Sequence, residues 1–408
     1  MKKYDIAVVG AGASGLTAAI SAKRENRSLS VCVLERLPRV GKKLLVTGNG
    51  RCNLTNNNMK RSYFHGTCTE LYNCIEAFDV KTFFQSIGVI CTADSEGRVY
   101  PKSNTASSVL DALRLETEKL GIEIICDFNV TEIKQGYIIA SETEKISADT
   151  IILAGGGLSQ ANLGSDGSVL RICKEMGIKV GKLSPALTTI KTNPDLVRAL
   201  KGLRVQAKAT LINNNKKIMS EVGEIQFNDG VLSGICIFNL SNYINDIEKA
   251  EIHLDLLPDM ENNSIEKMLF GIKEIRNSAS LEDYLSGIFH KRIGNILIKQ
   301  STSHQLTMPV SSLSDNDIVK IAARIKKLVF PVTGLQGFEK SQVTSGGVLI
   351  SEIDEQLMSK KYRGMYFCGE ILDIIGDCGG YNLTFAFSSG YLAGKNAARR
   401  INDKNDQN

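Results

Sequence analysis

Apolar residues recur with two different periods along this chain, and the change of period divides the sequence into regions. Residues 5–9, which are apolar at every position after Asp5, end at a cluster of glycines, and residues 16–22 have the composition of a helix. A second apolar run occupies residues 31–34. Short apolar runs flanked by turn formers are typical of strands buried in a parallel sheet. The opening pattern therefore predicts a strand, a glycine turn, a helix and a second strand.

The same kind of pattern continues to about residue 185. Apolar positions at helical spacing predict a helix over residues 106–120, which Gly121 ends. Residues 122–125, 128–133 and 150–153 predict strands. Beyond residue 185 the segments become short and alternate apolar with polar positions, which predicts an antiparallel barrel or sandwich. Its expected strands are residues 187–191, 205–212, 217–219, 224–227 and 251–256.

Helical spacing takes over between residues 259 and 328, and the first pattern then returns. The expected helices are residues 264–275, 281–289, 292–298 and 315–328. Residues 364–368 form another buried apolar run, closed by Gly369 and Glu370. Gly379 and Gly380 then precede a long helical pattern over residues 383–400. The C-terminal end thus repeats the order of strand, glycines and helix.

The first glycine turn has the spacing of a dinucleotide-binding motif. Gly10, Gly12 and Gly15 follow the first strand, and Glu35 lies twenty residues beyond the last of them, at the end of the second strand. The first glycine permits a sharp turn, the second lets the backbone approach a pyrophosphate, and the third lets the helix pack closely. A carboxylate at this offset accepts ribose hydroxyls. We therefore expect an adenine dinucleotide here.

Composition narrows the class of protein. The 408 residues are 43% hydrophobic and 23% charged, an ordinary globular balance with room for two or three domains. No apolar run approaches the roughly 20 residues of a membrane span, so we expect a cytoplasmic protein. The net charge of +5 is mild and lacks the concentrated basic stripe of a nucleic-acid binder. The ten cysteines form no Cys-x-x-Cys pair and no cluster with histidines, so we expect no metal site and no redox-active dithiol.

The C-terminal repeat of the strand and glycine pattern favours FAD over NAD. A helix that begins beside a flavin points its positive end at the negative charge of the reduced ring. The glycine- and cation-rich residues 36–56 can wrap the pyrophosphate. No second dinucleotide motif follows the strand at 150–153, although Gly155, Gly156 and Gly157 do, so we interpret that segment as a crossover returning to the first nucleotide.

Four segments closely resemble a bacterial family of FAD-dependent oxidoreductases in the two-dinucleotide-binding-domain superfamily. They are residues 41–56, 164–167, 342–348 and 376–383. The family includes uncharacterised flavoproteins, aminoacetone oxidase-like members and a relative linked to bile-acid dehydroxylation. One departure is at residues 227–235, where relatives often carry Thr-His before the glycine and Ser-Gly-Pro after it. Substrate preference is therefore expected to differ from that of relatives with His and Pro there.

The resemblance and the patterning together predict an α/β fold in three parts. A discontinuous Rossmann-like FAD domain spans residues 1–185 and 341–408, an inserted antiparallel β-barrel-like domain spans 186–258 and 329–340, and a helical insertion spans 259–328. The resemblance implies FAD contacts at Gly10, Gly12, Ala13, Ser14, Gly15, Glu35, Arg36, Lys42, Lys43, Asn53, Val130, Gly369, Glu370, Gly380, Tyr381, Asn382 and Leu383.

The predicted activity is hydride transfer between flavin N5 and a small organic substrate, either an amine or an enone of steroid-like type. Oxygen and a transiently bound NAD(P)H both stay open as the other redox partner. The alternatives are an FAD protein that acts on or binds RNA, and a flavin-bearing scaffold without turnover. The oligomeric state is left open.

No catalytic residue is assigned from the sequence. His253 alternates with apolar neighbours and is expected in solvent. His290 follows an apolar helical pattern and is a weak candidate for a catalytic group, because a histidine near a helix C-terminus usually complements the dipole. Cys52 is the best-placed thiol, since Arg51 can lower its pKa, although a packing role is favoured.

Overall fold

The computed structural model describes residues 1–134, 136–244 and 247–405, and the chain divides into two compact units. The first unit comprises Met1–Ala186 and Gly337–Asn408, and the second comprises Leu187–Gln336. The second unit is thus inserted between the two parts of the first. Each unit has its own cluster of buried apolar side chains.

Seven strands of the described chain form the main sheet of the first unit. β7, β2, β1 and β10 run parallel in that order, and β19 lies parallel to the second half of β10. β9 pairs antiparallel with the first half of β10, and β8 extends the sheet. The strands are β1 (Lys2–Val9), β2 (Val31–Leu34), β7 (Glu123–Ile125), β8 (Glu132–Lys134), β9 (Ile138–Ala140), β10 (Lys145–Leu153) and β19 (Met365–Phe367).

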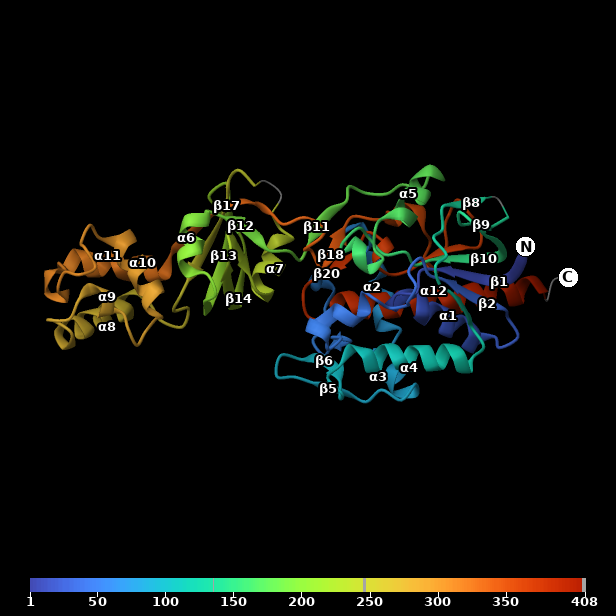
Figure 1. The fold of residues 1–408 in the computed structure, drawn as a ribbon, viewed down its shortest axis with the longest axis horizontal. Helices are drawn as coiled ribbons and strands as arrows, with labels where there is room; N and C mark the ends of the chain where they lie inside the picture. The colour runs from blue at the N-terminus through green and yellow to red at the C-terminus, as the bar shows by residue number, and fades with distance from the viewer. Residues whose placement is uncertain (135, 245–246, 406–408) are drawn as a thin grey trace. The chain divides into compact units, whose positions relative to one another are not determined.

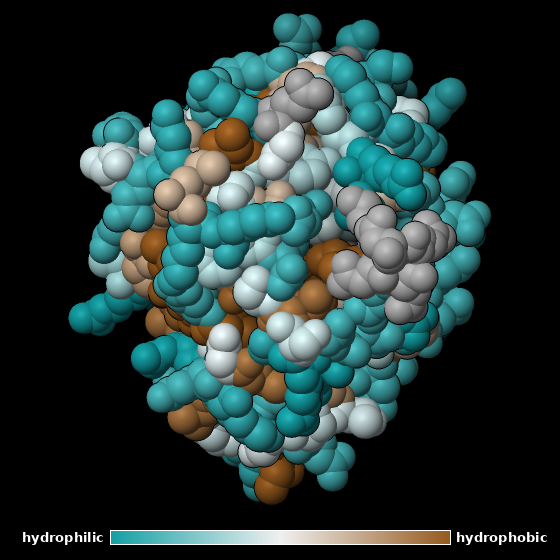
Figure 2. Space-filling view, turned by 90° about the vertical axis from the view of Figure 1, so that its right-hand side faces the viewer, coloured by the Kyte–Doolittle hydropathy of each residue, from teal (hydrophilic) through white to brown (hydrophobic). Residues whose placement is uncertain are grey.

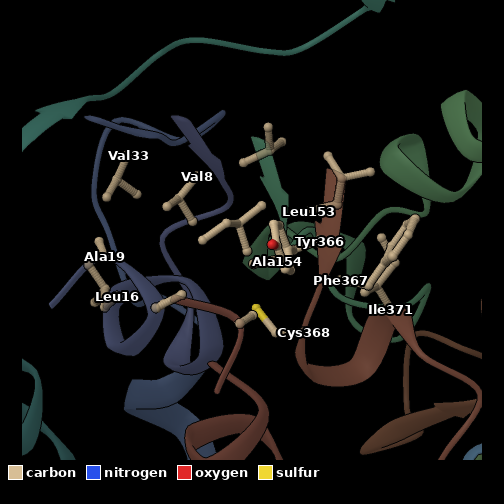
Figure 3. Close-up of a cluster of buried hydrophobic side chains, with 14 of the residues drawn as sticks. Val8, Leu16, Ala19, Val33, Leu153, Ala154, Tyr366, Phe367, Cys368 and Ile371 are labelled. Carbon is tan, nitrogen blue, oxygen red and sulfur yellow. The ribbon is translucent and has the colours of Figure 1, made fainter. Parts of the chain in front are cut away.

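Two helices from opposite ends of the chain pack against each other beside this sheet (Figure 1). They are α1 (Ala13–Glu25) and α12 (Tyr381–Asn405). A Cβ added at Gly394 would lie 3.0 Å from Ala18 Cα, so the two backbones meet without side chains between them. This close approach explains why the sequence of α12 is rich in glycine, alanine and serine. Apolar side chains of β1, β2, β10, β19 and α1 form the core beside them (Figure 3).

Short strand pairs join segments of the first unit that are far apart in sequence. β4 (Phe64–His65) pairs with β20 (Ile375–Gly376), and β11 (Ser184–Ala186) pairs with β18 (Val343–Ser345). The remaining elements of this unit are β3 (Thr55–Asn56), α2 (Tyr72–Glu76), α3 (Val80–Ser86), β5 (Cys91–Ala93), β6 (Arg98–Pro101), α4 (Ala106–Lys119) and α5 (Ser168–Glu175).

The second unit is a closed antiparallel barrel with a helical segment. The barrel order is β12-β15-β14-β13-β16-β17. Alternate residues of β13 and β16 are buried, as the period of two in the sequence predicts. The strands are β12 (Ile190–Thr192), β13 (Arg204–Asn213), β14 (Lys216–Asn228), β15 (Val231–Ser233), β16 (Ala250–Asp255) and β17 (Leu328–Leu335). Two helices, α6 (Pro194–Leu200) and α7 (Ile235–Ser241), belong to the same region.

The helical segment shares one continuous hydrophobic cluster with the barrel. Its helices are α8 (Asn262–Ile275), α9 (Leu281–Tyr284), α10 (Lys291–Ser301) and α11 (Asp315–Lys326). Lys326, at the end of α11, forms an ion pair of 2.6 Å with Asp255 at the end of β16. This contact and the shared cluster fix the segment to the barrel.

These elements confirm the predicted α/β fold with an inserted antiparallel barrel, and three local predictions are wrong. The strand expected at 128–133 is reduced to β8, because Phe128 N donates to Glu35 O instead of joining a ladder. The helix expected at 281–289 ends at Tyr284, before Gly287 with its φ of +96°. The two strands expected at 217–219 and 224–227 are one long strand, β14.

One face of the molecule is mainly hydrophilic, with apolar side chains gathered only in small groups (Figure 2). Within the described residues, we find no helix that combines the length and the apolar character needed to cross a bilayer.

Candidate dinucleotide site

The three glycines of the first turn differ in what surrounds them. Gly10 has a φ of +105°, and an added Cβ there would lie 2.5 Å from the carbonyl oxygen of Ala154. An added Cβ at Gly15 would lie 3.0 Å from the carbonyl carbon of Gly10. At Gly12, by contrast, no atom lies within 4 Å of an added Cβ, and the φ of −83° suits any residue. Close contacts within the protein therefore explain why glycine is required at positions 10 and 15. The open space at Gly12 has no such explanation, and it fits a ligand that approaches the backbone.

Glu35 joins this turn to the end of β2. Its carboxylate accepts hydrogen bonds from Ala11 N at 3.0 Å and from Leu37 N at 2.9 Å. Burial raises the pKa of Glu35, while the hydrogen bonds from Leu37 and Ala11 act in the opposite direction. Each carboxylate oxygen still has a lone pair for a further donor. Glu35 is therefore placed to accept hydroxyl groups beside the glycine turn.

A loop after β10 closes over Glu35. Arg36 forms an ion pair of 2.8 Å with Asp166, and an added Cβ at Gly164 would lie 3.9 Å from Glu35 Oε1. Arg36 Nε and Ser165 Oγ are buried without a hydrogen-bond partner in the described chain. Buried polar atoms are nearly always paired in folded proteins, so two such atoms beside one turn fit a polar ligand. The loop after β10 thus returns to the end of β2, and its role as a crossover to the first nucleotide stays a prediction.

Lys43 links the N-terminal loop to the C-terminal segment. Its Nζ lies 2.7 Å from Glu370 Oε2, and the other carboxylate oxygen of Glu370 accepts from Thr344 N at 2.8 Å. Lys42, in contrast, is exposed, and its Nζ lies 3.5 Å from the carbonyl oxygen of Asn162. Both lysines thus lie at the edge of the same region, but of the two only Lys43 has a carboxylate partner among the described residues.

The end of β19 lies directly on the start of α1. Gly369 has a φ of +76°, and an added Cβ would lie 2.8 Å from Ser14 Cβ. Gly369 N donates to Ser389 Oγ of α12 at 2.9 Å. The N-terminal turn and the C-terminal strand therefore meet at Ser14.

The second glycine turn packs on residues 53–55. Gly379 and Gly380 have φ values of +139° and +99°, and an added Cβ at Gly380 would lie 2.8 Å from Asn53 Oδ1. Asn53 is buried, and its Oδ1 has no hydrogen-bond partner in the described chain. Thr384 Oγ1 donates to Thr55 Oγ1 at 2.8 Å and fixes the start of α12. The first backbone amides of this helix have no partner within the helix, so they are available to an anionic group.

Tyr381, Asn382 and Leu383 lie at this helix start. The Tyr381 ring packs on Tyr63, with ring centroids 4.9 Å apart. Asn382 accepts from Gly376 N at 2.8 Å and donates to Gly376 O at 2.7 Å. These side chains hold the turn in place, so a ligand contact there would involve backbone amides. Leu383 is half-buried against the core, and Val130 is buried near Phe128 on the segment that follows β7.

The structure also brings together a pair that the sequence did not reveal. His65 Nε2 lies 2.8 Å from Asp377 Oδ1, although the two residues are 312 positions apart. The pairing of β4 with β20 creates this contact. No local spacing in the sequence signals it.

The other candidate groups have structural roles. Burial raises the pKa of Cys52 to about 12, so the buried thiol stays protonated and Arg51 does not activate it. His290 begins α10, where its Nδ1 accepts from Arg292 N at 3.2 Å, so the predicted position after a helix is wrong. His253 is half-buried and lies 2.7 Å from Glu251, which corrects the expectation of a solvated ring.

Comparisons with known proteins find relatives that match nearly the whole chain. The model of the HI0933-like protein Rossmann domain matches residues 4–396. The chain is 34% identical to a 3-dehydro-bile acid delta(4,6)-reductase of Clostridium scindens, over 97% of this chain and 99% of that protein. It is 26% identical to a ribosomal RNA dihydrouridine synthase of Haemophilus influenzae, over 96% of this chain and 98% of that protein. The structure of a 3-ketosteroid delta1-dehydrogenase from Sterolibacterium denitrificans is similar in fold, with a TM-score of 0.53 and 13% identity, over 98% of this chain and 100% of that one.

Proposed function

This chain belongs to the HI0933-like family and is an FAD-dependent oxidoreductase, and from that premise we propose that it reduces a carbon–carbon double bond conjugated to a carbonyl group. The observation that carries the proposal is the similarity to the bile acid reductase along nearly the whole chain. A delta(4,6) double-bond system beside a 3-ketone is a conjugated dienone. Dihydrouridine likewise differs from uridine by saturation of a ring double bond that is conjugated to a carbonyl. The two relatives therefore share one type of acceptor.

We propose that the residues of the candidate site hold FAD. They are Gly10, Gly12, Ala13, Ser14, Gly15, Glu35, Arg36, Lys42, Lys43, Asn53, Val130, Gly369, Glu370, Gly380, Tyr381, Asn382 and Leu383. The open space at Gly12 and the start of α1 suit the pyrophosphate, since unpaired helix amides and the helix dipole attract negative charge. Glu35 suits the ribose hydroxyls. The start of α12, with Asn53 Oδ1 beside it, suits the ring end of the cofactor.

When bound at these residues, FAD would supply the hydride-transfer chemistry. The chain supplies orientation and charge. The ion pair with Glu370 fixes the ammonium group of Lys43 at the edge of the candidate dinucleotide site. The dipole of α12 stabilises negative charge at its first turn. For a reductase the electrons must come from a donor, and we propose a transiently bound NAD(P)H.

A second candidate function is reduction of uridine within an RNA. The similarity to the dihydrouridine synthase supports it, because that match also extends along nearly the whole chain. The net charge of +5 is small for a protein with a large RNA-binding surface. We therefore favour a small conjugated ketone over RNA as the substrate.

The proposal is tested by the oxidation of the reduced flavin under anaerobic conditions. The holoprotein is reduced with light and a sacrificial donor, and then mixed with a 4,6-dien-3-one steroid, with the matching saturated 3-ketone, or with a uridine-containing RNA. We expect the flavin absorbance near 450 nm to return with the dienone, together with a product two mass units heavier, and not with the saturated ketone. Return with RNA alone would favour the second candidate. No return with either conjugated acceptor would contradict the proposal.

A further inference from the structure

Leu45 and Val46 form an exposed apolar pair in the first unit. They are consecutive in the chain, and they are 37% and 48% exposed. The other exposed large apolar side chains in the described part of this unit are Met1, Ile90 and Leu115, and no two of them are neighbours in sequence. Single exposed apolar residues are normal on a protein surface, so the adjacent pair is the feature that needs an explanation.

Hydrogen bonds hold the backbone of the apolar pair in one helical turn. Leu45 N donates to Gly41 O at 3.2 Å, and Val46 N donates to Lys43 O at 3.3 Å. The preceding side chain, Leu44, is buried in the core of the first unit and anchors this turn. The two exposed side chains are therefore presented by a fixed backbone.

A strained and closed turn follows the apolar pair directly. Cys52 N donates to Thr47 O at 2.9 Å and closes it. Asn49 and Cys52 have φ values of +56° and +59°, a conformation that other residues than glycine keep only where surrounding contacts impose it. One such contact is the Arg51 guanidinium, which lies 4.4 Å from the centroid of the Tyr100 ring on β6. The backbone on this side of the pair is thus fixed as well.

The apolar pair lies in sequence between two proposed FAD contacts. Before it, Lys43 is ion-paired with Glu370 at 2.7 Å. After it, the strained turn ends at Asn53, and an added Cβ at Gly48 would lie 2.8 Å from Asn53 N. An added Cβ at Gly380 would lie 2.8 Å from Asn53 Oδ1, so this end of the turn reaches the start of α12. Both ends of the short segment that presents the pair therefore meet the proposed cofactor site.

An apolar surface at this place fits an apolar ligand. Aliphatic side chains offer no hydrogen bond to the polar pyrophosphate and ribityl chain of FAD. They suit a uridine in RNA no better, because its backbone is charged. The fused carbocyclic rings of a steroid-like ketone, by contrast, gain free energy when they cover aliphatic side chains. The dimethylbenzene edge of the flavin is the other apolar group of the proposed complex, and the test below separates it from the substrate.

We propose that Leu45 and Val46 bind the fused apolar rings of the ketone substrate. The inference rests on the proposed function. It gives the apolar pair a role in holding the substrate and none in hydride transfer. Substitutions in the pair should therefore weaken binding of the ketone, while the limiting rate of flavin oxidation and the affinity for FAD stay as they are.

The test compares Leu45→Gln with Leu115→Gln, which makes the same change on the exposed face of α4. Photoreduced holoprotein is mixed anaerobically with increasing concentrations of the 4,6-dien-3-one steroid, which gives an apparent Kd and a limiting rate. We expect Leu45→Gln to raise the apparent Kd about fivefold, and the double variant with Val46→Thr to raise it about tenfold, as expected when part of an aliphatic side chain leaves water. The limiting rate and the Kd for FAD should match the wild type. Leu115→Gln should match it in all three quantities.

The possible results have different meanings. A wild type that the dienone does not oxidise overturns the proposed function, and the inference with it. If the wild type reacts and both Leu45→Gln and the double variant keep its apparent Kd, the pair is no substrate contact and the function stands. Weaker FAD binding would assign the pair to the flavin, and an equal effect of Leu115→Gln would make the change nonspecific; either result overturns the inference. If Leu45→Gln does not fold, the single variant Val46→Thr, which conserves shape, decides by the same comparison.

Discussion

Replacing Gly12 by alanine separates the role of the cofactor from the role of the fold. Nothing lies within 4 Å of an added Cβ at this position, and the backbone at φ −83° and ψ −168° is open to alanine. The apoprotein therefore has room for the methyl group. If the pyrophosphate approaches the backbone here, the methyl group occupies its place, and Gly12→Ala should harm binding of FAD without harming the fold.

The expected changes follow from two small opposing effects and one large one. Alanine is a poorer N-cap than glycine, which costs about 0.5 kcal/mol, whereas the less flexible unfolded chain returns about 0.4–1 kcal/mol. The free energy of unfolding of the apoprotein should therefore change by less than about 0.5 kcal/mol, a Tm shift of about 2 °C or less. A steric conflict with the cofactor should weaken FAD binding at least tenfold, or about 1.4 kcal/mol.

The assay measures both properties on the same preparations. Thermal unfolding of the apoprotein gives Tm, and titration with FAD followed by flavin fluorescence gives Kd. Gly15→Ala is the matched control, since its Cβ would lie 3.0 Å from the carbonyl carbon of Gly10 and should lower Tm without any ligand, by about 4 °C or more. Unchanged FAD affinity in Gly12→Ala would refute the reasoning, and so would an apoprotein destabilised as much as Gly15→Ala.

Three further predictions concern individual side chains. Lys43→Met removes the partner of Glu370, 2.7 Å away, and should weaken FAD binding about tenfold; a titration that gives the wild-type Kd would contradict the proposed contact. Because burial raises the pKa of Cys52 to about 12, its thiol should resist iodoacetamide at pH 8 in the folded protein and react after unfolding, as peptide mass spectrometry can measure; labelling of folded protein would count against it. Ser314→Ala removes the capping box of α11 and should cost about 1 kcal/mol in the unfolding of the second unit with FAD affinity unchanged; calorimetry and titration check both, and an unaltered unfolding curve would contradict the first.

Local sequence signals predicted the parts of the site that depend on neighbouring residues. The strand, glycine turn and helix at residues 2–25 follow from spacing alone, and Glu35 has its backbone partners at that turn. The C-terminal strand and helix were found in the same way, since β19 and α12 carry a second copy of the pattern. The predicted family and fold class depend on such local patterns, and both are confirmed. The proposed division into three domains stays a prediction, because the contacts within the chain divide it into two compact units.

Contacts between distant segments were beyond local reasoning. The pairs Lys43 with Glu370 and His65 with Asp377 each depend on how residues hundreds of positions apart meet, and no period or spacing encodes that meeting. The error at His290 has a different physical cause. Ile288 and Phe289 extended an apolar pattern past Gly287, whose positive φ ends the helical region, so the histidine begins the next helix and does not follow the last one.

The central claim is that two distant ends of the chain form one FAD site, and hydrogen–deuterium exchange tests it most directly. Apoprotein is compared with FAD-loaded protein by mass spectrometry of peptides from both ends. We predict that bound FAD slows exchange together in peptides covering residues 10–15 and 35–43 and in peptides covering residues 369–383. Protection confined to the N-terminal peptides, or none in either group at saturating FAD, would contradict the claim.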